Sequence, residues 1–340
     1  MERKKYGFRQ SFRWLAGFCM MVALFLGMPA AVKASPVSAN GWLHVKGNKV
    51  VNEKGKPFVI KGVSTHGLSW YPQYVNKKAF KTLRDKWGVN TIRLAMYTSE
   101  YNGYCTGGSD NQKQLEQLIA KGVSYAKDLG MYVIIDWHIL SDGNPLTYKK
   151  EARAFFKKMA KKYKNTKNVI FEICNEPNGS DGNWTNIRSY AKSMVSVIRS
   201  QNKKALIIVG TPTWSQDVDQ AAANPVKDKN LAYALHFYAG THGQYLRDRL
   251  ESVLKQKVPV IVTEFGLSDA SGNGNINTTE GDAWLKLMNK YKVGRVCWNL
   301  SNKNESSSLI KASCTKTSGW KKSDLSAEGK WLVKAYGGKY

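Results

Sequence analysis

Two glutamates in similar local contexts are the residues of this sequence with the clearest chemical potential. Glu176 lies in the run Asn175-Glu176-Pro177, Glu264 precedes Phe265-Gly266, and each follows a short apolar, β-branched run. Two carboxylates on either side of a gap suit glycoside hydrolysis, in which one protonates the departing oxygen and the other attacks the sugar or activates water. The alternative is that the two glutamates are simply exposed or ion-paired, but this does not explain why their local sequence contexts are so similar.

Eight β-branched runs, most of them followed by an amphipathic segment, must position these glutamates. The runs recur about every 25–40 residues, and this alternation of strand and helix predicts an α/β fold. Eight repeats favour a single (β/α)8 TIM barrel over an open sheet. The predicted strands are Phe58–Val63, Thr91–Met96, Met131–Trp137, Val169–Cys174, Ala205–Val209, Leu231–Phe237, Val258–Thr263 and Gly294–Leu300.

Helices are expected between these strands, and a short hairpin is expected before them. The segment Leu43–Val51, with Gly47-Asn48 at its turn, predicts an N-terminal β-hairpin that closes the bottom of the barrel. The predicted helices are Lys77–Trp87, Gln112–Leu129, Lys149–Tyr163, Asn183–Arg199, His242–Gln256, Thr279–Tyr291 and Ala327–Ala335.

Other polar and aromatic residues gather where the predicted strands end. In a barrel of this kind the carboxyl ends of the strands carry the chemistry. A structural role could explain any one histidine there, but it does not explain polar residues at the end of nearly every strand. Flat aromatic rings also suit the faces of sugar rings. The residues at or just beyond strand ends include His66, Trp70, Tyr71, Tyr97, His138, Trp214, His236, Tyr238 and Trp298, and Arg93 lies within the second strand.

These motifs resemble glycoside hydrolase family 5. The family pattern is carried by Asn175-Glu176-Pro177 and by Val262-Thr263-Glu264-Phe265-Gly266. The stretches 136–145, 236–244 and 66–71 are similar to its bacterial endoglucanase (cellulase) branch. The resemblance covers about residues 41–337. Phe265 stands where the family often has tryptophan, which keeps an aromatic ring at that position.

The resemblance implies a secreted endo-β-1,4-glucanase with a retaining mechanism, in which Glu176 is the general acid/base and Glu264 the nucleophile. Asn175 would bind the sugar 2-hydroxyl, and Arg93 and Tyr238 would contact Glu264 and keep it ionised. Glu176 would carry the proton, which the negative charge of Glu264 favours. The two carboxyl groups should lie about 5–5.5 Å apart.

The resemblance also implies roles for residues around the two glutamates. No metal or cofactor is expected, and the partner is a β-glucan polysaccharide. His138 and His236 would complete the polar floor, Trp298 would form a platform under the sugar, and the other substrate-binding residues would be His66, Trp70, Tyr71, Tyr97, Trp214, Lys303 and Glu305.

Other functions remain open from the sequence. The same scaffold could act on mannan, xylan, xyloglucan or mixed-linkage glucan, because the two glutamates do not distinguish these polymers. A barrel that binds carbohydrate or cell wall without catalysis is an alternative of another class. A serine hydrolase is disfavoured because the sequence contains no G-x-S-x-G motif.

Residues 1–34 read as a secretory signal peptide. Basic residues precede the short apolar run Trp14–Leu26, and Val32-Lys33-Ala34 offers small residues at the usual cleavage positions. The alternative is an uncleaved anchor, but the run is shorter than the ~20 residues that a membrane span needs. We therefore expect cleavage near Ala34, a mature catalytic domain of residues 35–340, and a secreted protein without a membrane span.

Composition and charge set further limits. The 340 residues are 42% hydrophobic and 23% charged, which excludes disorder as a description of the whole chain. The formal net charge is +27, and +22 remains after residue 34. That charge suits an anionic wall polymer or simple solubility, and export argues against nucleic acid. Lysines interleave with apolar residues at helical spacing over 149–167, which predicts a solvated helix face. We expect a monomer.

The mature chain holds four cysteines, and none has zinc-ligand spacing. Cys174 and Cys297 fall in apolar strands and are expected to be buried free thiols. Cys105 and Cys314 fall in loops, and the sequence leaves open whether they form a disulfide.

Overall fold

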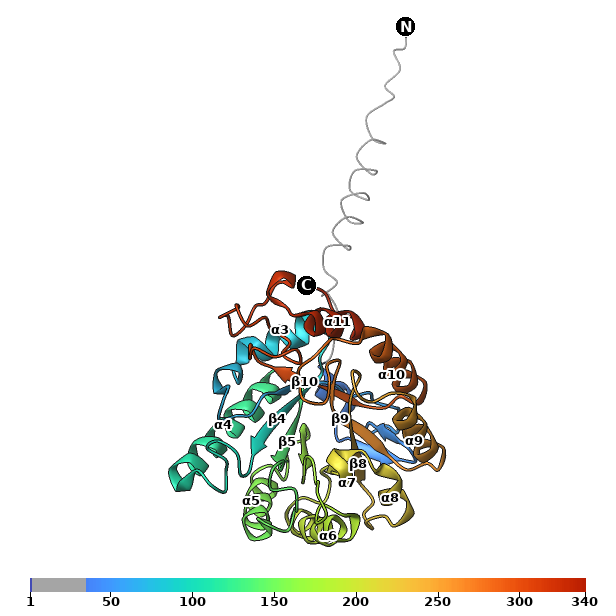
Figure 1. Cartoon of the computed structure of the whole chain (residues 1–340). Coiled ribbons are helices and arrows are strands. Elements are labelled where there is room, and N and C mark those ends of the chain that lie inside the picture. The colour runs from blue at the N-terminus through green and yellow to red at the C-terminus, as the bar shows by residue number, and fades with distance from the viewer. Residues whose placement is uncertain (2–34) are drawn as a thin grey trace. The chain divides into compact units, whose positions relative to one another are not determined.

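Eight parallel strands close into a barrel in the computed structural model, which describes Met1 and residues 35–340 (Figure 1). The predicted signal peptide lies outside the described residues. The strand order around the barrel is β10-β3-β4-β5-β6-β7-β8-β9, so the prediction of a (β/α)8 barrel is confirmed. The strands are β3 (Lys61–Thr65), β4 (Thr91–Tyr97), β5 (Tyr132–His138), β6 (Val169–Glu172), β7 (Ile207–Val209), β8 (Leu231–Tyr238), β9 (Val260–Gly266) and β10 (Arg295–Leu300).

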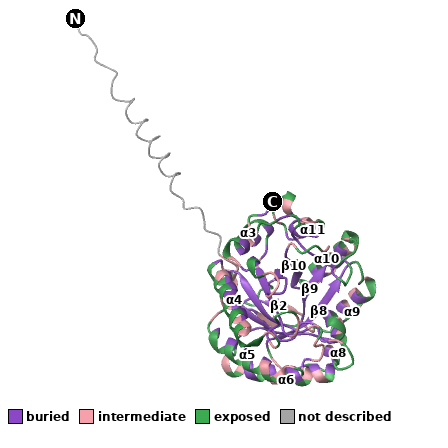
Figure 2. Ribbon diagram, turned by 60° about the vertical axis from the view of Figure 1, so that its left-hand side comes forward, coloured by how far each residue is buried: buried purple, intermediate pink, exposed green. Residues whose placement is uncertain are grey.

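Helices surround the barrel and pack their apolar faces against the strands, while their other faces are exposed (Figure 2). Helix α5 shows the pattern well: Phe155, Phe156 and Met159 are buried, and its lysines from 157 onward are exposed, as predicted. The helices are α2 (Pro36–Asn40), α3 (Lys77–Trp87), α4 (Gly108–Asp128), α5 (Lys149–Lys162), α6 (Trp184–Gln201), α7 (Pro212–Ser215), α8 (Val218–Ala223), α9 (Gln244–Lys255), α10 (Thr278–Tyr291) and α11 (Ala327–Ala335).

The predicted hairpin lies at the amino ends of the barrel strands, as expected. Strands β1 (His44–Lys46) and β2 (Lys49–Val51) pair antiparallel, and the amide of Val45 donates to the side chain of Asn230, just before β8. Leu43 and Val50 join an apolar cluster inside the barrel that includes Ile60, Ile134 and Ile208. The hairpin therefore covers the bottom of the barrel, and the opposite end stays open for the site.

Alternation along each strand divides its side chains between two cores. In β8, Ala232 and Ala234 belong to the cluster inside the barrel, whereas Leu235 and Phe237 belong to the larger cluster between strands and helices. Successive residues of a strand point to opposite faces, so His236 and Tyr238 continue the inward row. The barrel interior is apolar at the bottom and polar near the carboxyl ends.

Strand β9 breaks this alternation next to Glu264, one of the two candidate catalytic residues. Between Ala234 and His236, β8 advances two residues, while the partners on β9 advance three, from Ile261 to Glu264. Strand β10 shows the same shift against β9. A bulge of this kind inserts one residue and re-aims the side chains after it. Both Thr263 and Glu264 therefore reach the interior, although they are adjacent in sequence.

Several element boundaries differ from the predicted ones. Strand β3 starts at Lys61 and not at Phe58, and β6 ends at Glu172, before Cys174. The short helices α7 and α8 after β7 were not predicted, because segments of four and six residues carry too little periodicity. These differences do not move the candidate residues away from the carboxyl ends of the strands.

All four cysteines of the described region are free thiols, and Cys174 and Cys297 are buried as predicted. Cys105 and Cys314 do not form a disulfide in this structure. Among residues 35–340, no helix has the length and apolarity needed to cross a membrane.

Candidate active site

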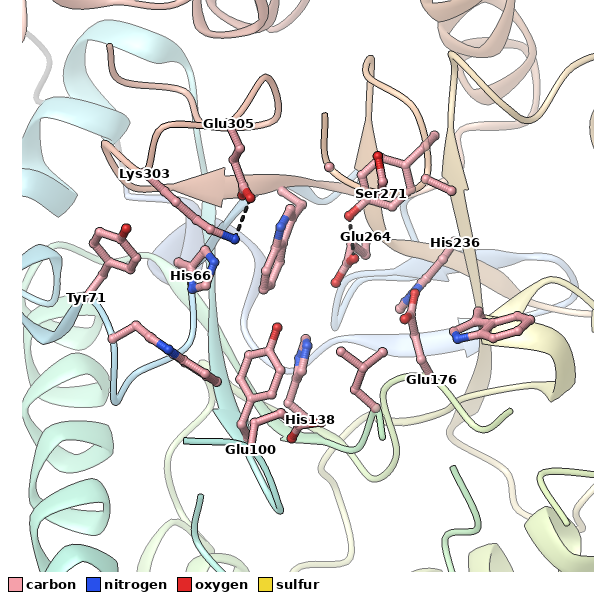
Figure 3. Close-up of a pocket in the computed structure, with 18 of the residues that line it drawn as sticks. His66, Tyr71, Glu100, His138, Glu176, His236, Glu264, Ser271, Lys303 and Glu305 are labelled. Atoms are coloured by element: carbon pink, nitrogen blue, oxygen red, sulfur yellow. Dashed lines mark hydrogen bonds and ion pairs between the residues drawn. The ribbon is translucent and has the colours of Figure 1, made fainter. Parts of the chain in front are cut away.

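A cleft of about 670 Å³ opens at the carboxyl ends of the barrel strands, and both candidate glutamates line it (Figure 3). A carboxylate oxygen of Glu176 lies within 4.8 Å of one of Glu264. Glu176 follows β6 and Glu264 lies on β9, so the two residues approach from opposite sides of the barrel. A short separation of this kind is the arrangement that retaining glycosidases use.

Both oxygens of Glu264 accept hydrogen bonds from charged or buried donors. Nη1 of Arg93 donates to Oε2 at 3.0 Å, and the hydroxyl of Tyr238 donates to Oε1 at 2.7 Å. Burial, together with the charge of Glu264, raises the pKa of Tyr238 well above its usual value, so Tyr238 keeps its proton and remains a donor. These two contacts hold the carboxylate in one orientation.

Arg93 is the centre of a buried ionic cluster beneath the cleft. Its Nε and Nη2 donate to the two oxygens of Glu172 at 2.8 and 3.2 Å, and Nη2 also meets Asp136 at 3.0 Å. Burial opposes the charge on Glu172, but Arg93 outweighs it and lowers the pKa of Glu172 to about 2. Arg93 thus connects Glu264 to a second carboxylate, that of Glu172.

Asp136 is the carboxyl group of this cluster whose pKa is shifted upward. Burial and the neighbouring carboxylates of Glu172 and Glu264 raise its pKa well above the usual value, against the opposing effect of Arg93. Oδ2 of Asp136 accepts from Nδ1 of His138 at 2.6 Å, while Oδ1 has no hydrogen-bond partner among the described residues. Burial and Arg93 lower the pKa of His138 to about 3, so this imidazole is neutral.

The side chain of Asn175 has a fixed orientation in this network. Its Oδ1 accepts from Nη2 of Arg93 at 2.5 Å, and its Nδ2 donates to Nε2 of His138 and to the carbonyl of Ile139, both at 3.1 Å. Nε2 of His138 is therefore the acceptor, and Nδ1 carries the hydrogen. A sugar hydroxyl that binds Asn175 must share its amide hydrogens with these two acceptors.

Glu176 is connected to the same cluster through His236. Nδ1 of His236 lies 2.9 Å from Oε1 of Glu176, and its Nε2 lies 2.9 Å from the hydroxyl of Thr263, which donates to Glu172 at 2.7 Å. Burial opposes the imidazolium, but Glu172 and Glu176 outweigh it and raise the pKa of His236 to about 9. At neutral pH His236 therefore carries a hydrogen on both ring nitrogens, and its Nδ1–H donates to Glu176, the candidate acid.

Trp214 stands at the rim of the cleft on a left-handed turn. Thr213, Trp214 and Ser215 have φ values of 56°, 52° and 58°, each of which costs a non-glycine residue about 1–3 kcal/mol. The amide of Trp214 donates to the carbonyl of Pro177, and the hydroxyl of Ser215 donates to the carbonyl of Asn175. The turn thus ties an exposed indole to the segment that carries Glu176.

All eight residues predicted to bind substrate line the same cleft. Arg93 and Asn175 lie beneath it, fully buried. The predictions missed Glu172, Asp136 and Thr263 as parts of the site, although Glu172 and Asp136 are the single acids of their apolar strands, which was a usable signal. They also missed lining residues from the surrounding loops: Glu100, Leu140, Gln216, His242, Ala270, Ser271 and Gly272.

Glu176, His236 and Glu264 are also close enough to be considered as metal ligands. Their atoms already have other partners, since His236 bonds to Glu176, and Arg93 and Tyr238 occupy both oxygens of Glu264. An imidazolium cannot ligate a cation, and neutral imidazole is required. The hydrogen-bond pattern therefore favours acid–base chemistry at these three residues.

The buried histidines predict a stability maximum near pH 6.5. His236 has a pKa of about 9 in the folded protein, above the 6.5 of an unfolded histidine, so its contribution is complete below pH 6.5 and is lost as pH rises to 9. The pKa of His138 is about 3 and that of His66 about 4, the latter through burial and then Lys303. Those two sites destabilise the fold as pH falls below 6.5.

Calorimetric unfolding between pH 4 and 9 measures this curve. We expect His236→Gln to flatten the alkaline side and leave the acid side in place. An alkaline side of unchanged slope in that variant would contradict the assigned charge state of His236.

Comparison with known proteins agrees with this geometry. The pattern of the family described as "Cellulase (glycosyl hydrolase family 5)" matches residues 51–304. "Endoglucanase A" of Butyrivibrio fibrisolvens is 48% identical over 294 residues, which are 86% of this chain and 68% of that protein. An "Endoglucanase" of Clostridium saccharobutylicum is 44% identical over 333 residues, 97% of this chain and 73% of that protein.

Solved structures agree as well. "Cellulase Cel5C_n" superposes with a TM-score of 0.86 at 38% identity and covers 91% of this chain and 95% of its own. The catalytic domain of Thermobifida fusca endoglucanase Cel5A has a TM-score of 0.85 at 34% identity, with 89% of this chain and all of that one covered. The match to the family pattern spans most of the chain, and the identities are high over most of its length. The chain therefore belongs to the cellulase family, glycosyl hydrolase family 5.

Proposed function

We propose that this glycoside hydrolase is an endo-β-1,4-glucanase that cleaves internal bonds of cellulose and related β-glucans with retention of configuration. The observation that carries the proposal is the approach of Glu176 and Glu264 to within 4.8 Å across the cleft, each with its own set of hydrogen-bond partners. Short carboxylate spacing is the geometric condition for a covalent glycosyl-enzyme intermediate.

In the first step, a carboxylate oxygen of Glu264 attacks the anomeric carbon, and the bond to the glycosidic oxygen breaks. Glu176 transfers its proton to that oxygen, so the leaving chain departs as a neutral alcohol. Arg93 and Tyr238 hold Glu264 in position, because their hydrogen bonds fix both of its oxygens before substrate arrives.

In the second step, Glu176 acts as a base. It takes a proton from water, whose oxygen attacks the anomeric carbon and releases Glu264 as a carboxylate. Once Glu264 is esterified its negative charge is gone, which favours the ionised form of Glu176. Nδ1 of His236, 2.9 Å from Oε1 of Glu176, holds this carboxyl group in position in both steps.

The lining of the cleft supports a glucan substrate. Trp70, Trp298 and Trp214 offer indole rings along the cleft, and Lys303 and Glu305 form an ion pair at 2.5 Å beside His66. A close structural neighbour, a variant of the Thermobifida fusca endoglucanase domain, was solved with cellotetraose. Aromatic platforms with a few fixed polar groups are typical of sites for amphipathic ligands such as sugars.

Release of reducing ends by the purified protein tests this function. The substrates are carboxymethylcellulose, barley β-glucan, lichenan, glucomannan, xylan and mannan, and Glu176→Ala is the control. Activity on the first two with a rapid fall in viscosity is expected. Activity confined to mannan or xylan would change the substrate and keep the mechanism, and silence on every polymer would favour a barrel that only binds carbohydrate.

We also propose that the chain is exported and cleaved near Ala34, so that residues 35–340 act outside the cell as one monomeric catalytic domain. The basic and apolar pattern of residues 1–34 supports export. N-terminal sequencing of protein recovered from the culture medium should begin at Ser35. An intact Met1 on protein held in the membrane fraction would support the anchor.

A further inference from the structure

Tyr101 is an exposed aromatic residue beside the cleft, on the loop between β4 and α4. Its relative exposure is 62%, the highest of the aromatic side chains in the described part of the chain. Glu100, its neighbour, lines the cleft, whereas Tyr101 lies just outside. An aromatic ring this exposed gains little from folding, and its face is free to contact a ligand.

The ring of Tyr101 continues a row of rings that starts at the reaction centre. Ring centroids are 5.3 Å apart between Trp298 and His66, 5.8 Å between His66 and Trp70, and 5.8 Å between Trp70 and Tyr101. The planes of Trp70 and Tyr101 are inclined at 42°. The row therefore leads outward from the cleavage point, and Tyr101 is its outermost member.

The loop that carries Tyr101 is anchored on both sides of the ring. The carbonyl of Asn102 accepts from the hydroxyl of Ser69 and from the side-chain amide of Asn111, both at 2.7 Å. On the other side, Oε1 of Glu100 accepts from the amide of Ser141 at 2.8 Å. The backbone is thus held before any ligand binds, which lowers the entropic cost of using the ring as a contact.

The loops after β3 and β4, which carry Ser69 and Asn102, also line a second hollow. Its polar groups can bind the hydroxyls of a sugar. Its volume is about 290 Å³, and side-chain amides dominate its polar lining. The polar residues that line it are Ser69, Asn102, Asn111, Gln114, Gln117 and Lys121.

The end of the glucan that meets Tyr101 follows from the positions of the two glutamates. Trp214 is bonded through its amide to Pro177, next to Glu176, so it lies on the side where the leaving chain departs. Lys303, His66 and Tyr71 lie on the other side of Glu264 from Glu176 (Figure 3). Trp70 and Tyr101 extend from His66, on the side of the chain that becomes attached to Glu264.

We infer that Tyr101 is an additional stacking platform for a glucosyl unit beyond Trp70, at the non-reducing end of a long β-1,4-glucan chain. The inference rests on the proposed function, because it takes a glucan as the ligand of the cleft. Tyr101 is a specificity-determining residue in this scheme and does not touch the reacting atoms. It makes the enzyme favour longer chains.

Kinetics on cellotetraose, cellopentaose and cellohexaose test the platform. Tyr101→Ala should raise KM for cellohexaose about three- to tenfold, the range expected for one aromatic contact. The kcat for cellohexaose and both constants for cellotetraose should stay unchanged, because a contact made equally in ground and transition states affects binding alone. Tyr101→Phe keeps the ring face and should restore wild-type values.

The cleavage pattern tests which end of the chain is bound. With cellohexaose labelled at its reducing end, loss of the platform should move the cuts toward the non-reducing end. Movement toward the reducing end would place Tyr101 on the leaving-group side and overturn the assignment. An equal loss for every chain length, or no change at all, would overturn the platform itself.

A matched control and a binding measurement separate this inference from the proposed function. Tyr340 is 46% exposed, and its hydroxyl bonds to the carbonyl of Lys330, far along the chain from the cleft residues. Tyr340→Ala should therefore leave all constants unchanged. Calorimetric titration of cellohexaose into Glu264→Gln protein, with and without Tyr101→Ala, measures the platform without turnover. Equal affinities would contradict the platform, whatever the activity.

Discussion

Replacement of Glu264 by glutamine should abolish turnover and leave the fold intact. We expect kcat on carboxymethylcellulose to fall by about four orders of magnitude or more, because no other group can form the covalent intermediate. Glutamine has the same shape, and it can accept from Arg93 with its oxygen and donate to Tyr238 with its nitrogen. Arg93 also keeps both hydrogen bonds to Glu172.

The comparison that isolates the nucleophile uses a glutamate outside the cleft. Glu251 on α9 pairs with Lys290 at the surface, so Glu251→Gln makes the same chemical change without touching the site. Reducing-end assays and thermal unfolding of both variants are the measurements. Near-normal activity of Glu264→Gln would remove Glu264 as nucleophile, and a collapse of its unfolding temperature would show that the charge is needed for folding.

Replacement of Glu176 by alanine should affect the two chemical steps differently. Loss of the general acid should lower turnover on polysaccharide by about 10²- to 10⁴-fold. An aryl cellobioside with an acidic phenol does not need protonation to leave, so the first step should stay fast and give a burst of phenol. The second step should then become rate-limiting, because no base activates water.

Sodium azide provides the diagnostic measurement for this variant. Azide attacks without giving up a proton, so it should restore turnover of the aryl glycoside and yield a β-glycosyl azide. The methyl of alanine leaves space beside Nδ1 of His236, where the carboxylate stood at 2.9 Å. Failure of azide to accelerate the reaction, with a burst still present, would assign the base role to another group.

Much of the fold and site could be predicted from the sequence because the relevant signals are local. Helices α3 and α11 have the predicted boundaries, and the barrel strands fall within a few residues of the predicted runs. The period of two along each strand separates inward from outward side chains, so strand-end residues of eight strands had to meet around one mouth. Glu176 and the eight substrate-binding candidates therefore came together from residue order alone.

The alternation of side chains along a regular strand does not explain why Glu264 points into the barrel. A regular strand would send Thr263 and Glu264 to opposite faces, and only the extra residue of β9 against both its neighbours brings both inside. Register against two other strands sets this bulge, and those strands lie far away in the sequence. The motif around Glu264 marked the residue, but it could not show how the strand presents it.

For the buried ionic cluster around Arg93, too, the sequence indicated the residues and only the structure showed how they interact. The sequence identified His138, Asn175 and His236 as candidates because each lies on or beside a predicted strand end, and it identified Arg93, within the second strand, through the family resemblance. Their contacts came only with the structure: one guanidinium meets Glu172, Asp136 and Glu264, and within this cluster the pKa of Asp136 is raised while that of Glu172 is lowered. Such coupling depends on distances of about 3 Å between residues of different strands, and residue order does not contain them.

The sequence by itself therefore determined the barrel, the end at which the candidate residues gather, and the identity of the two candidate glutamates. The tertiary structure decided how those groups are held and charged, and where the cleft extends. It placed Trp214 on a left-handed turn and put Tyr101 beside Trp70, 31 positions earlier in the chain. Short-range periodicity fixes secondary structure, whereas the register between strands and the packing of loops are settled by contacts between distant residues.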